Sequence, residues 1–594
     1  MEKDRKKGRA GFGIGFSLLL ILMLALLELN KNTLAGWILC LAAAAAFLWL
    51  RRRAKKKGLR ALYLLGWLAL FVGIFLLTWP PVKDVPAAEG KDPARSPVVL
   101  TQKGKVQGLI SADGAVEVFA GIPYAKPPVG ELRWREPQDP DAWTDTLVCD
   151  HFAPMSMQPT NSPLYSSLAQ IIGYHDYRIS TDDNHVEPVS EDSLYINVWK
   201  PSGEVSGLPV CVFIHGGSLQ TGQPWYADYS GLGLAREGVI VVNMGYRLGV
   251  FGYLADAELA AESENGTTGN YGLLDQIKAL EWVRDNIAAF GGDPDNVTLA
   301  GESAGAAAVS ALCASPLAKG LFRRVILESS TLASPEPPHS FRSLDEALES
   351  GRELKERYGV SSIAELRALP AEKLVGEANS QHHMTVDGYA LTETPCESYR
   401  RGVHNEEAIL HGYNSAESGP FILFSQASMK NYEQKIRAYF KDYADEILAI
   451  YPAATDEEAR AYWAEIYGAV FFDYPHYCLN RLAVENNIPV WEYRFSKTNG
   501  RLGPWHSGEM VYCYGNIPAD SALYDARDRE LSAQMLRCWA NFAANGDPNG
   551  AGLPEWEQNL SSSRLMGFGN ETAMTDEREH ALFAVLDKMQ GWGE

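Results

Sequence analysis

The sequence predicts an α/β protein, in which helices cover a mostly parallel sheet, preceded by three membrane-spanning helices. Two observations lead to this fold class. From residue 98 onward, short apolar runs of β-forming residues alternate with helical patterns, as they do in a parallel sheet. Before residue 80, three apolar runs follow one another, each of roughly 17–20 residues and so able to cross a ~30 Å hydrocarbon layer.

Composition restricts the possible partners. The 594 residues carry a formal net charge of −21, and residues 1–60 hold thirteen Lys and Arg against three acidic residues, so the rest of the chain carries −31. Such a polyanionic domain argues against nucleic acid as a partner, because phosphate contacts need clustered cations. The eight cysteines form no C-x-x-C pair, which argues against a zinc or redox motif. We expect neither a metal nor a cofactor.

The three apolar runs are flanked by positive charge. They cover residues 11–29, 34–50 and 61–79, with basic residues in 1–9 and 51–60. A cleaved signal peptide is the alternative for the first run, but a convincing small-residue cleavage site is lacking and two more runs follow. Counting positive charge then predicts that the N-terminus and the 51–60 loop lie in the cytoplasm. Three spans would place everything after Trp79 outside the cell.

The predicted organisation follows from these runs. Residues 80–96 are rich in Pro, Ala and charge and have little to bury, which is typical of a tether. We therefore expect a cytoplasmic basic N-terminus (1–9), a membrane region with three helices (10–80), a Pro-rich linker (81–97) and an extracellular globular domain (98–594).

A G-x-S-x-G pattern stands where a strand is expected to turn into a helix. The pattern is Gly301-Glu302-Ser303-Ala304-Gly305, after the apolar run 297–300 and before the small, helix-compatible run 306–312. This is the setting of a nucleophile elbow, which presents its serine at the carboxyl end of a strand. We interpret Ser303 as a catalytic nucleophile.

A serine nucleophile needs a base, which follows it in the chain order of elbow-type hydrolases. Of the twelve histidines, His506 lies in a Gly- and Pro-bounded loop late in the chain. His476 lies among aromatic residues and His580 in a charged terminal helix, so both fit structural roles better. His506 is the predicted base.

The base in turn needs an orienting acid. Glu417 comes shortly after the strand-like run 408–414, at the end where a carboxylate can meet the histidine. Glu406 and Glu407 precede that run, at the wrong end of the sheet. Glu417 is therefore the predicted acid.

Backbone N–H groups must also stabilise a developing oxyanion. Residues 213–218 end a predicted strand with an H-G-G turn, whose N–H groups are little hindered. Together with the N–H of Ala304, this turn predicts an oxyanion hole.

With these motifs, the chain resembles the type-B carboxylesterases, the family that includes bacterial para-nitrobenzyl esterases and cholinesterases. The resemblance covers essentially all of residues 98–590. Besides the elbow, it rests on residues 119–125, 127–130, 132–134, 190–199, 246–249, 270–276 and 539–543.

The resemblance implies an α/β-hydrolase fold and roles for individual residues. Ser303 would be the nucleophile, Glu417 the triad acid and His506 the base. The N–H groups of Gly217, Ser218 and Ala304 would form the oxyanion hole. The expected function is a membrane-anchored serine esterase that acts on small-molecule esters. Two alternatives remain: a surface binding or adhesion protein on the same fold, and an amidase or carbamate hydrolase.

The sequence departs from the family pattern at one loop. Where the family often has a disulfide, Ser156 and Ser193 stand at the two positions, so we expect this loop to be closed by packing alone. No Trp occurs between them, so a choline-binding aromatic cage is not supported. Aromatic residues around 156–190 and 420–480 suggest an apolar gorge: Tyr165, Tyr174, Tyr177, Phe421, Phe424, Phe471 and Phe472.

Overall fold

The chain divides into two compact units. The computed structural model describes residues 2–82, 84–90, 92–160, 164, 168, 188–337, 341–375, 383–500, 502–558, 564–576 and 580–592. One unit comprises Met1–Asp84 with Thr160–Pro188, and the other comprises Val85–Pro159 with Val189–Glu594.

The first unit contains the predicted apolar helices, here α1 (Glu2–Leu29), α2 (Leu34–Arg53) and α3 (Lys57–Leu77). Each is long and apolar enough to cross a membrane. Two of the helices extend further into the basic segment than the apolar runs suggest. Arg and Lys are good helix formers, so the 51–60 segment contributes the last turn of α2 and the start of α3.

Aromatic stacking holds the three helices together. The ring of Trp67 on α3 lies 4.9 Å from that of Phe47 on α2 and 5.2 Å from that of Phe16 on α1, measured between centroids. At one end of the bundle, Asn32 in the α1–α2 loop donates to Thr78 Oγ1 at 3.0 Å, next to the end of α3. These contacts bring all three helices into one bundle.

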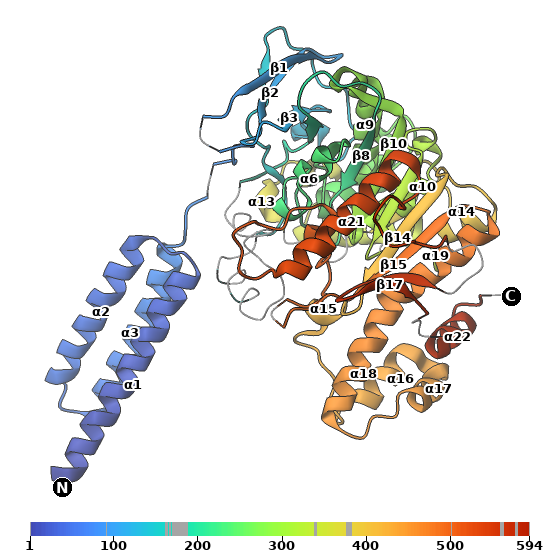
Figure 1. The fold of residues 1–594 in the computed structure, drawn as a ribbon. Helices are drawn as coiled ribbons and strands as arrows, with labels where there is room; N and C mark the ends of the chain where they lie inside the picture. Colours follow the sequence, from blue (N-terminus) through green and yellow to red (C-terminus); the bar gives the residue numbers. More distant parts are fainter. Residues whose placement is uncertain are drawn as a thin grey trace. The chain divides into compact units, whose positions relative to one another are not determined.

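The second unit is built on a mostly parallel sheet (Figure 1). Among the described residues the main path of strands runs β1-β2-β3-β7-β9-β8-β10-β11-β14-β15-β16-β17, parallel from β9 to β16. Their bounds are Arg95–Leu100, Lys105–Ile110, Val116–Pro123, Tyr195–Pro201, Ile240–Met244, Leu208–Ile214, Gly292–Glu302, Arg324–Glu328, Ala408–Asn414, Val490–Phe495, Leu565–Phe568 and Thr572–Thr575. This confirms the predicted fold class.

Helices cover this sheet (Figure 1). The longer ones that the site depends on are α9 (Tyr271–Asn286), α10 (Ala304–Ala314), α18 (Asp456–Gly468), α19 (Tyr474–Glu485) and α21 (Ala526–Asn545). Short helical elements carry further site residues: α15 (Gly419–Ile422) and a π-helix, η8 (Ala469–Asp473). Both α10 and α21 contact the central strands β8 and β10.

The central strands bring three chain segments to one edge of the sheet. Every residue of β9, β11 and β14 is buried, which explains why these strands consist of near-continuous apolar runs. In the parallel register, Gly301 of β10 lies opposite Ile214 of β8, and Glu302 opposite Glu328 of β11. Glu328 in turn lies opposite Gly412 of β14. The residues that follow β8, β10 and β14 therefore share the carboxyl edge.

The expectation that packing alone closes the loop between Ser156 and Ser193 is wrong. The two hydroxyl oxygens lie 2.9 Å apart and are buried, and Ser156 Oγ also donates to the Tyr246 carbonyl at 2.6 Å. Nearby, Arg133 forms a bidentate pair with Glu191, with both N–O distances 2.5 Å. Hydrogen bonds replace the covalent link at the base of this loop.

Candidate active site

Ser303 stands at a sharp turn between β10 and α10. Its backbone has φ 55° and ψ −127°, in the left-handed half of the map that residues with a Cβ avoid. The two flanking glycines are required by close packing: a Cβ on Gly301 would lie 2.6 Å from the Gly305 carbonyl carbon, and one on Gly305 would lie 2.0 Å from the Ile214 oxygen. The strand, turn and helix predicted from the sequence are all present.

The structure brings the three predicted side chains together. His506 Nε2 lies 2.8 Å from Ser303 Oγ, and its Nδ1 lies 2.6 Å from Glu417 Oε2. Glu417 Oε1 accepts the backbone N–H of Asn414 at 2.7 Å, which fixes the carboxyl group in the turn after β14. An imidazole held in this way between a hydroxyl and a carboxylate can remove the hydroxyl proton.

Burial raises the pKa of Glu417 to about 8, and the hydrogen bond from the Asn414 N–H opposes the rise. The 2.6 Å separation between Glu417 Oε2 and Nδ1 fits a charge-assisted bond to the carboxylate form of Glu417, so we assign the proton of neutral His506 to Nδ1. Nε2 then keeps its lone pair toward Ser303. Removal of the Ser303 hydroxyl proton by His506 would require this tautomer.

The predicted oxyanion turn lies beside the elbow. Gly217 and Ser218 have φ of 101° and 58°, and the Gly217 carbonyl accepts the N–H groups of Gln220 and Thr221. Within the described part of the chain, no hydrogen bond engages the N–H groups of Gly217, Ser218 or Ala304. These three donors are therefore available to a ligand oxygen.

Two of the predicted gorge aromatics contact the histidine. The ring centroids of Phe421 on α15 and Phe472 on η8 lie 5.0 and 5.1 Å from that of His506. The π-helical turn that carries Phe472 is a rare geometry that recurs at functional sites. Phe424 is 96% exposed and contributes no wall. Tyr165, Tyr174 and Tyr177 lie outside the described residues.

Three site residues received no role from the sequence. Glu302 Oε1 lies 3.4 Å from His506 Nε2, and Ser507 donates to the same oxygen at 2.5 Å. Glu509 is fully buried and accepts from Ser329 at 3.0 Å and from Asn414. The sequence feature that could have pointed to these three residues is their proximity in the chain to Ser303 and His506, since each lies within three residues of one of them.

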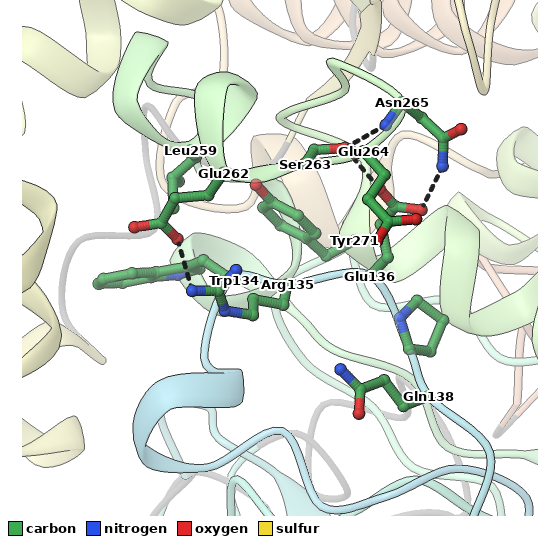
Figure 2. Close-up of a pocket in the computed structure, with 11 residues that line it drawn as sticks. Trp134, Arg135, Glu136, Gln138, Leu259, Glu262, Ser263, Glu264, Asn265 and Tyr271 are labelled. Atoms are coloured by element: carbon green, nitrogen blue, oxygen red, sulfur yellow. Dashed lines mark hydrogen bonds and ion pairs between the residues drawn. The ribbon is translucent and has the colours of Figure 1, made fainter.

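A separate cavity of about 300 Å³ contains none of these groups (Figure 2). It lies between the 134–138 segment and the 259–265 segment. Several of its polar side chains pair with one another: Ser263 and Asn265 donate to Glu136, and Arg135 pairs with Glu262 at 3.2 Å (Figure 2). None of the residues that line this cavity is a histidine or a cysteine, and the Ser303–His506 pair lies instead at the carboxyl edge of the sheet.

A nucleophile elbow on a mostly parallel, helix-covered sheet defines the α/β-hydrolase class. Comparison with known proteins agrees. The model of the "Carboxylesterase family" matches residues 95–583. The carboxylesterase EST55 of Geobacillus stearothermophilus superposes with a TM-score of 0.69 at 30% identity, over 82% of this chain and 99% of that one. A PNB esterase gives 0.68 at 29% identity, over 82% and 99%.

Proteins of similar sequence show to which family within the α/β-hydrolase class the chain belongs. Fumonisin B1 esterase from Sphingopyxis macrogoltabida is 33% identical over 556 residues, covering 89% of this chain and 94% of that protein. Carboxylesterase 1C from Rattus norvegicus is 33% identical over 503 residues, covering 78% and 88%. The chain belongs to the carboxylesterase family, and it is a carboxylic ester hydrolase.

Proposed function

We propose that the protein is a membrane-anchored serine carboxylesterase with Ser303, His506 and Glu417 as its triad. The observation that carries the proposal is the hydrogen-bonded order of the three side chains, 2.8 Å from Ser303 to His506 and 2.6 Å from His506 to Glu417. Chain order, burial and the elbow geometry support the same roles. The substrate class is a small-molecule carboxylic ester.

In the first half-reaction, Ser303 Oγ attacks the ester carbonyl carbon while His506 Nε2 takes the hydroxyl proton. Glu417 accepts the Nδ1 hydrogen and stabilises the imidazolium. The N–H groups of Gly217, Ser218 and Ala304 donate to the oxyanion, and the partial positive charge at the start of α10 favours it. When the tetrahedral intermediate collapses, the ester C–O bond breaks and the leaving alkoxide takes the proton from Nε2.

In the second half-reaction, water replaces the alcohol. His506 Nε2 removes a proton from the water as its oxygen attacks the acyl-enzyme carbonyl. The bond to Ser303 Oγ then breaks, and the proton returns to Ser303. The carboxylic acid leaves, so the net reaction converts one ester and one water into an alcohol and an acid and regenerates the protein.

The membrane arrangement is part of the proposal. Residues 1–9 would lie in the cytoplasm, 10–80 would form three spans, 81–97 would be a linker and 98–594 the catalytic domain outside the cell. The length and apolarity of α1, α2 and α3 support spanning, and the basic residues at 51–60 support the orientation.

The central test uses the full-length protein in detergent and its Ser303→Ala variant. We expect a fluorophosphonate probe to label the wild type, which should also hydrolyse para-nitrophenyl acetate and butyrate, and both signals to vanish in the variant. Ser310→Ala, on the same helix, is the matched control. Matched anilide and carbamate substrates would identify an amidase or carbamate hydrolase. A folded wild type that neither labels nor turns over would leave a binding or adhesion role instead.

Topology has its own test. In intact cells that express the protein, a membrane-impermeant fluorophosphonate should label Ser303, and an epitope tag at the N-terminus should bind antibody only after permeabilisation. The opposite pattern in both assays would reverse the orientation.

A further inference from the structure

Ser507, directly after the histidine, has an unusual backbone. Its φ is +64°, in the left-handed region where a residue with a Cβ is disfavoured. Such a conformation persists only where surrounding contacts hold it, and these positions cluster at functional sites. The contact here is a 2.5 Å hydrogen bond from Ser507 Oγ to Glu302 Oε1.

Glu302 faces the same nitrogen of His506 as the nucleophile does. Its Oε1 lies 3.4 Å from Nε2, while Ser303 Oγ lies 2.8 Å from that atom. The other oxygen, Oε2, packs against Gly216, where an added Cβ would approach it to 2.9 Å. Oε1 therefore points at the reacting nitrogen, and Oε2 points toward the oxyanion turn.

The charge state of Glu302 matters for this nitrogen. Burial raises the pKa of Glu302 to about 8, and the carboxylates of Glu509 and Glu417 add to the rise, so with Glu417 ionised the carboxyl group of Glu302 holds a proton near neutral pH. The titratable groups that face it are His506, Glu417, Glu509, Tyr229 and Tyr246. A carboxylic acid O–H on Oε1 would donate to the lone pair of Nε2, which Ser303 needs for its own proton.

We propose that Ser507 is a positioning residue that keeps the proton of Glu302 on Oε2. The carbonyl oxygen of a carboxylic acid is its stronger acceptor, so the hydrogen bond from Ser507 selects the form in which Oε1 is the carbonyl. The lone pair of Nε2 is then left to Ser303. This inference rests on the proposed triad and adds to it a residue that acts through Glu302 rather than on the substrate.

The test measures kcat/KM for para-nitrophenyl butyrate against pH in Ser507→Gly. Glycine adopts this backbone without strain, so the fold should be retained. We expect a loss of about tenfold near pH 7, the size of one competing hydrogen bond of ordinary strength. The loss should shrink toward pH 9 and above as Glu302 ionises. Ser507→Ala, which keeps the Cβ, is measured beside it as a second variant without the hydroxyl.

A double-mutant cycle separates positioning from general disruption. In a Glu302→Met background the carboxyl group is gone, so Ser507→Gly should change kcat/KM less than about twofold. Ser263→Ala removes a hydroxyl-to-carboxylate bond of the same length, 2.5 Å, in the cavity of Figure 2, and should leave activity unchanged. A loss equal at every pH, or undiminished by Glu302→Met, would overturn the inference. Wild-type behaviour of Ser507→Gly and Ser507→Ala would overturn it too, whereas activity that survives Ser303→Ala would overturn the triad itself.

Discussion

Two buried glutamates face the two ring nitrogens of His506, and they differ in what holds them. Glu417, in the turn after β14, lies 2.6 Å from Nδ1 and is fixed by the Asn414 N–H. Glu302, the last residue of β10, lies 3.4 Å from Nε2 and is held by the Ser507 hydroxyl. Burial raises the pKa of both to about 8. Neighbouring charges contribute to the shift at Glu302, whereas burial and hydrogen bonds set the shift at Glu417, so the two carboxyl groups differ in surroundings although their pKa values are alike.

The two carboxyl groups differ in which group donates a hydrogen bond to the oxygen that faces His506. Around Glu417, the Asn414 N–H donates to Oε1, and the carboxylate form of Glu417 accepts the imidazole N–H at Oε2, 2.6 Å away. Around Glu302, the oxygen nearer the imidazole already accepts from Ser507. We therefore expect Glu417 to orient His506, and not Glu302, which precedes Ser303 in the chain.

The largest expected effect comes from Glu417→Gln. The Asn414 N–H requires the amide oxygen, so the amide NH₂ must face Nδ1, which forces the histidine proton onto Nε2. His506 could then no longer accept from Ser303, and we expect kcat to fall by roughly three to four orders of magnitude. Steady-state hydrolysis of para-nitrophenyl butyrate measures it.

Glu407→Gln is the matched control for this substitution. Its side chain is 64% exposed and pairs with Arg323 at the opposite end of β14, so activity should be unaffected. If Glu417→Gln lost less than about tenfold, Glu417 would not orient the base.

The sequence predicted the placement of site residues best where the motif and the local structure occupy adjacent residues. Ser303 could be placed because strand, turn and helix occupy adjacent residues, and the strand before Glu417 was predicted at the bounds it has, 408–414. His506 followed from the chain order of elbow-type hydrolases and its loop. That these side chains meet is a property of the parallel sheet, which aligns the carboxyl ends of its strands.

What could not be predicted depends on contacts between distant segments. The Ser507–Glu302 bond spans 205 positions, and nothing in a serine residue signals a φ of +64°. The Ser156–Ser193 bond was missed for a related reason. Serines in place of cysteines predict the loss of a covalent link, although two hydroxyls at hydrogen-bonding distance supply a weaker one.

Glu302→Gln should have a far smaller effect than Glu417→Gln. The amide oxygen can accept from Ser507, which directs the NH₂ group away from Nε2, so the variant resembles protonated Glu302. We expect kcat/KM near pH 7 to change by about two- to fivefold. Above pH 8 the wild type gains a carboxylate that stabilises the imidazolium, and the variant cannot, so the gap should widen with pH. A loss comparable to that of Glu417→Gln would contradict the distinction drawn between the two sides of His506.

The smallest effect on activity is expected at a third buried glutamate, Glu328 of β11, which contacts no histidine in the described structure. Its oxygens accept from Trp539 at 2.9 Å, Cys513 at 3.2 Å and Tyr514 at 2.9 Å. Burial, with a contribution from Glu509, raises the pKa of Glu328 to about 8. Glu328→Gln suits this site, because the amide oxygen can face Trp539 and the Tyr514 hydroxyl can turn to accept from NH₂. At pH 7 we expect kcat/KM within about twofold of wild type.

The effect of Glu328→Gln should appear instead in how the stability of the protein depends on pH. A carboxyl group with a raised folded-state pKa binds its proton more tightly when folded, so the stabilisation is complete below the unfolded pKa of about 4.3. It is lost as pH rises through about 8. Glu328→Gln cannot ionise, so its Tm should fall less between pH 6 and pH 9 than that of the wild type, by about 1–2 °C. Parallel curves for the two proteins would mean that Glu328 is ionised throughout, with its three donors outweighing burial. In that case burial alone could not explain the raised pKa of the two glutamates around His506, Glu302 and Glu417.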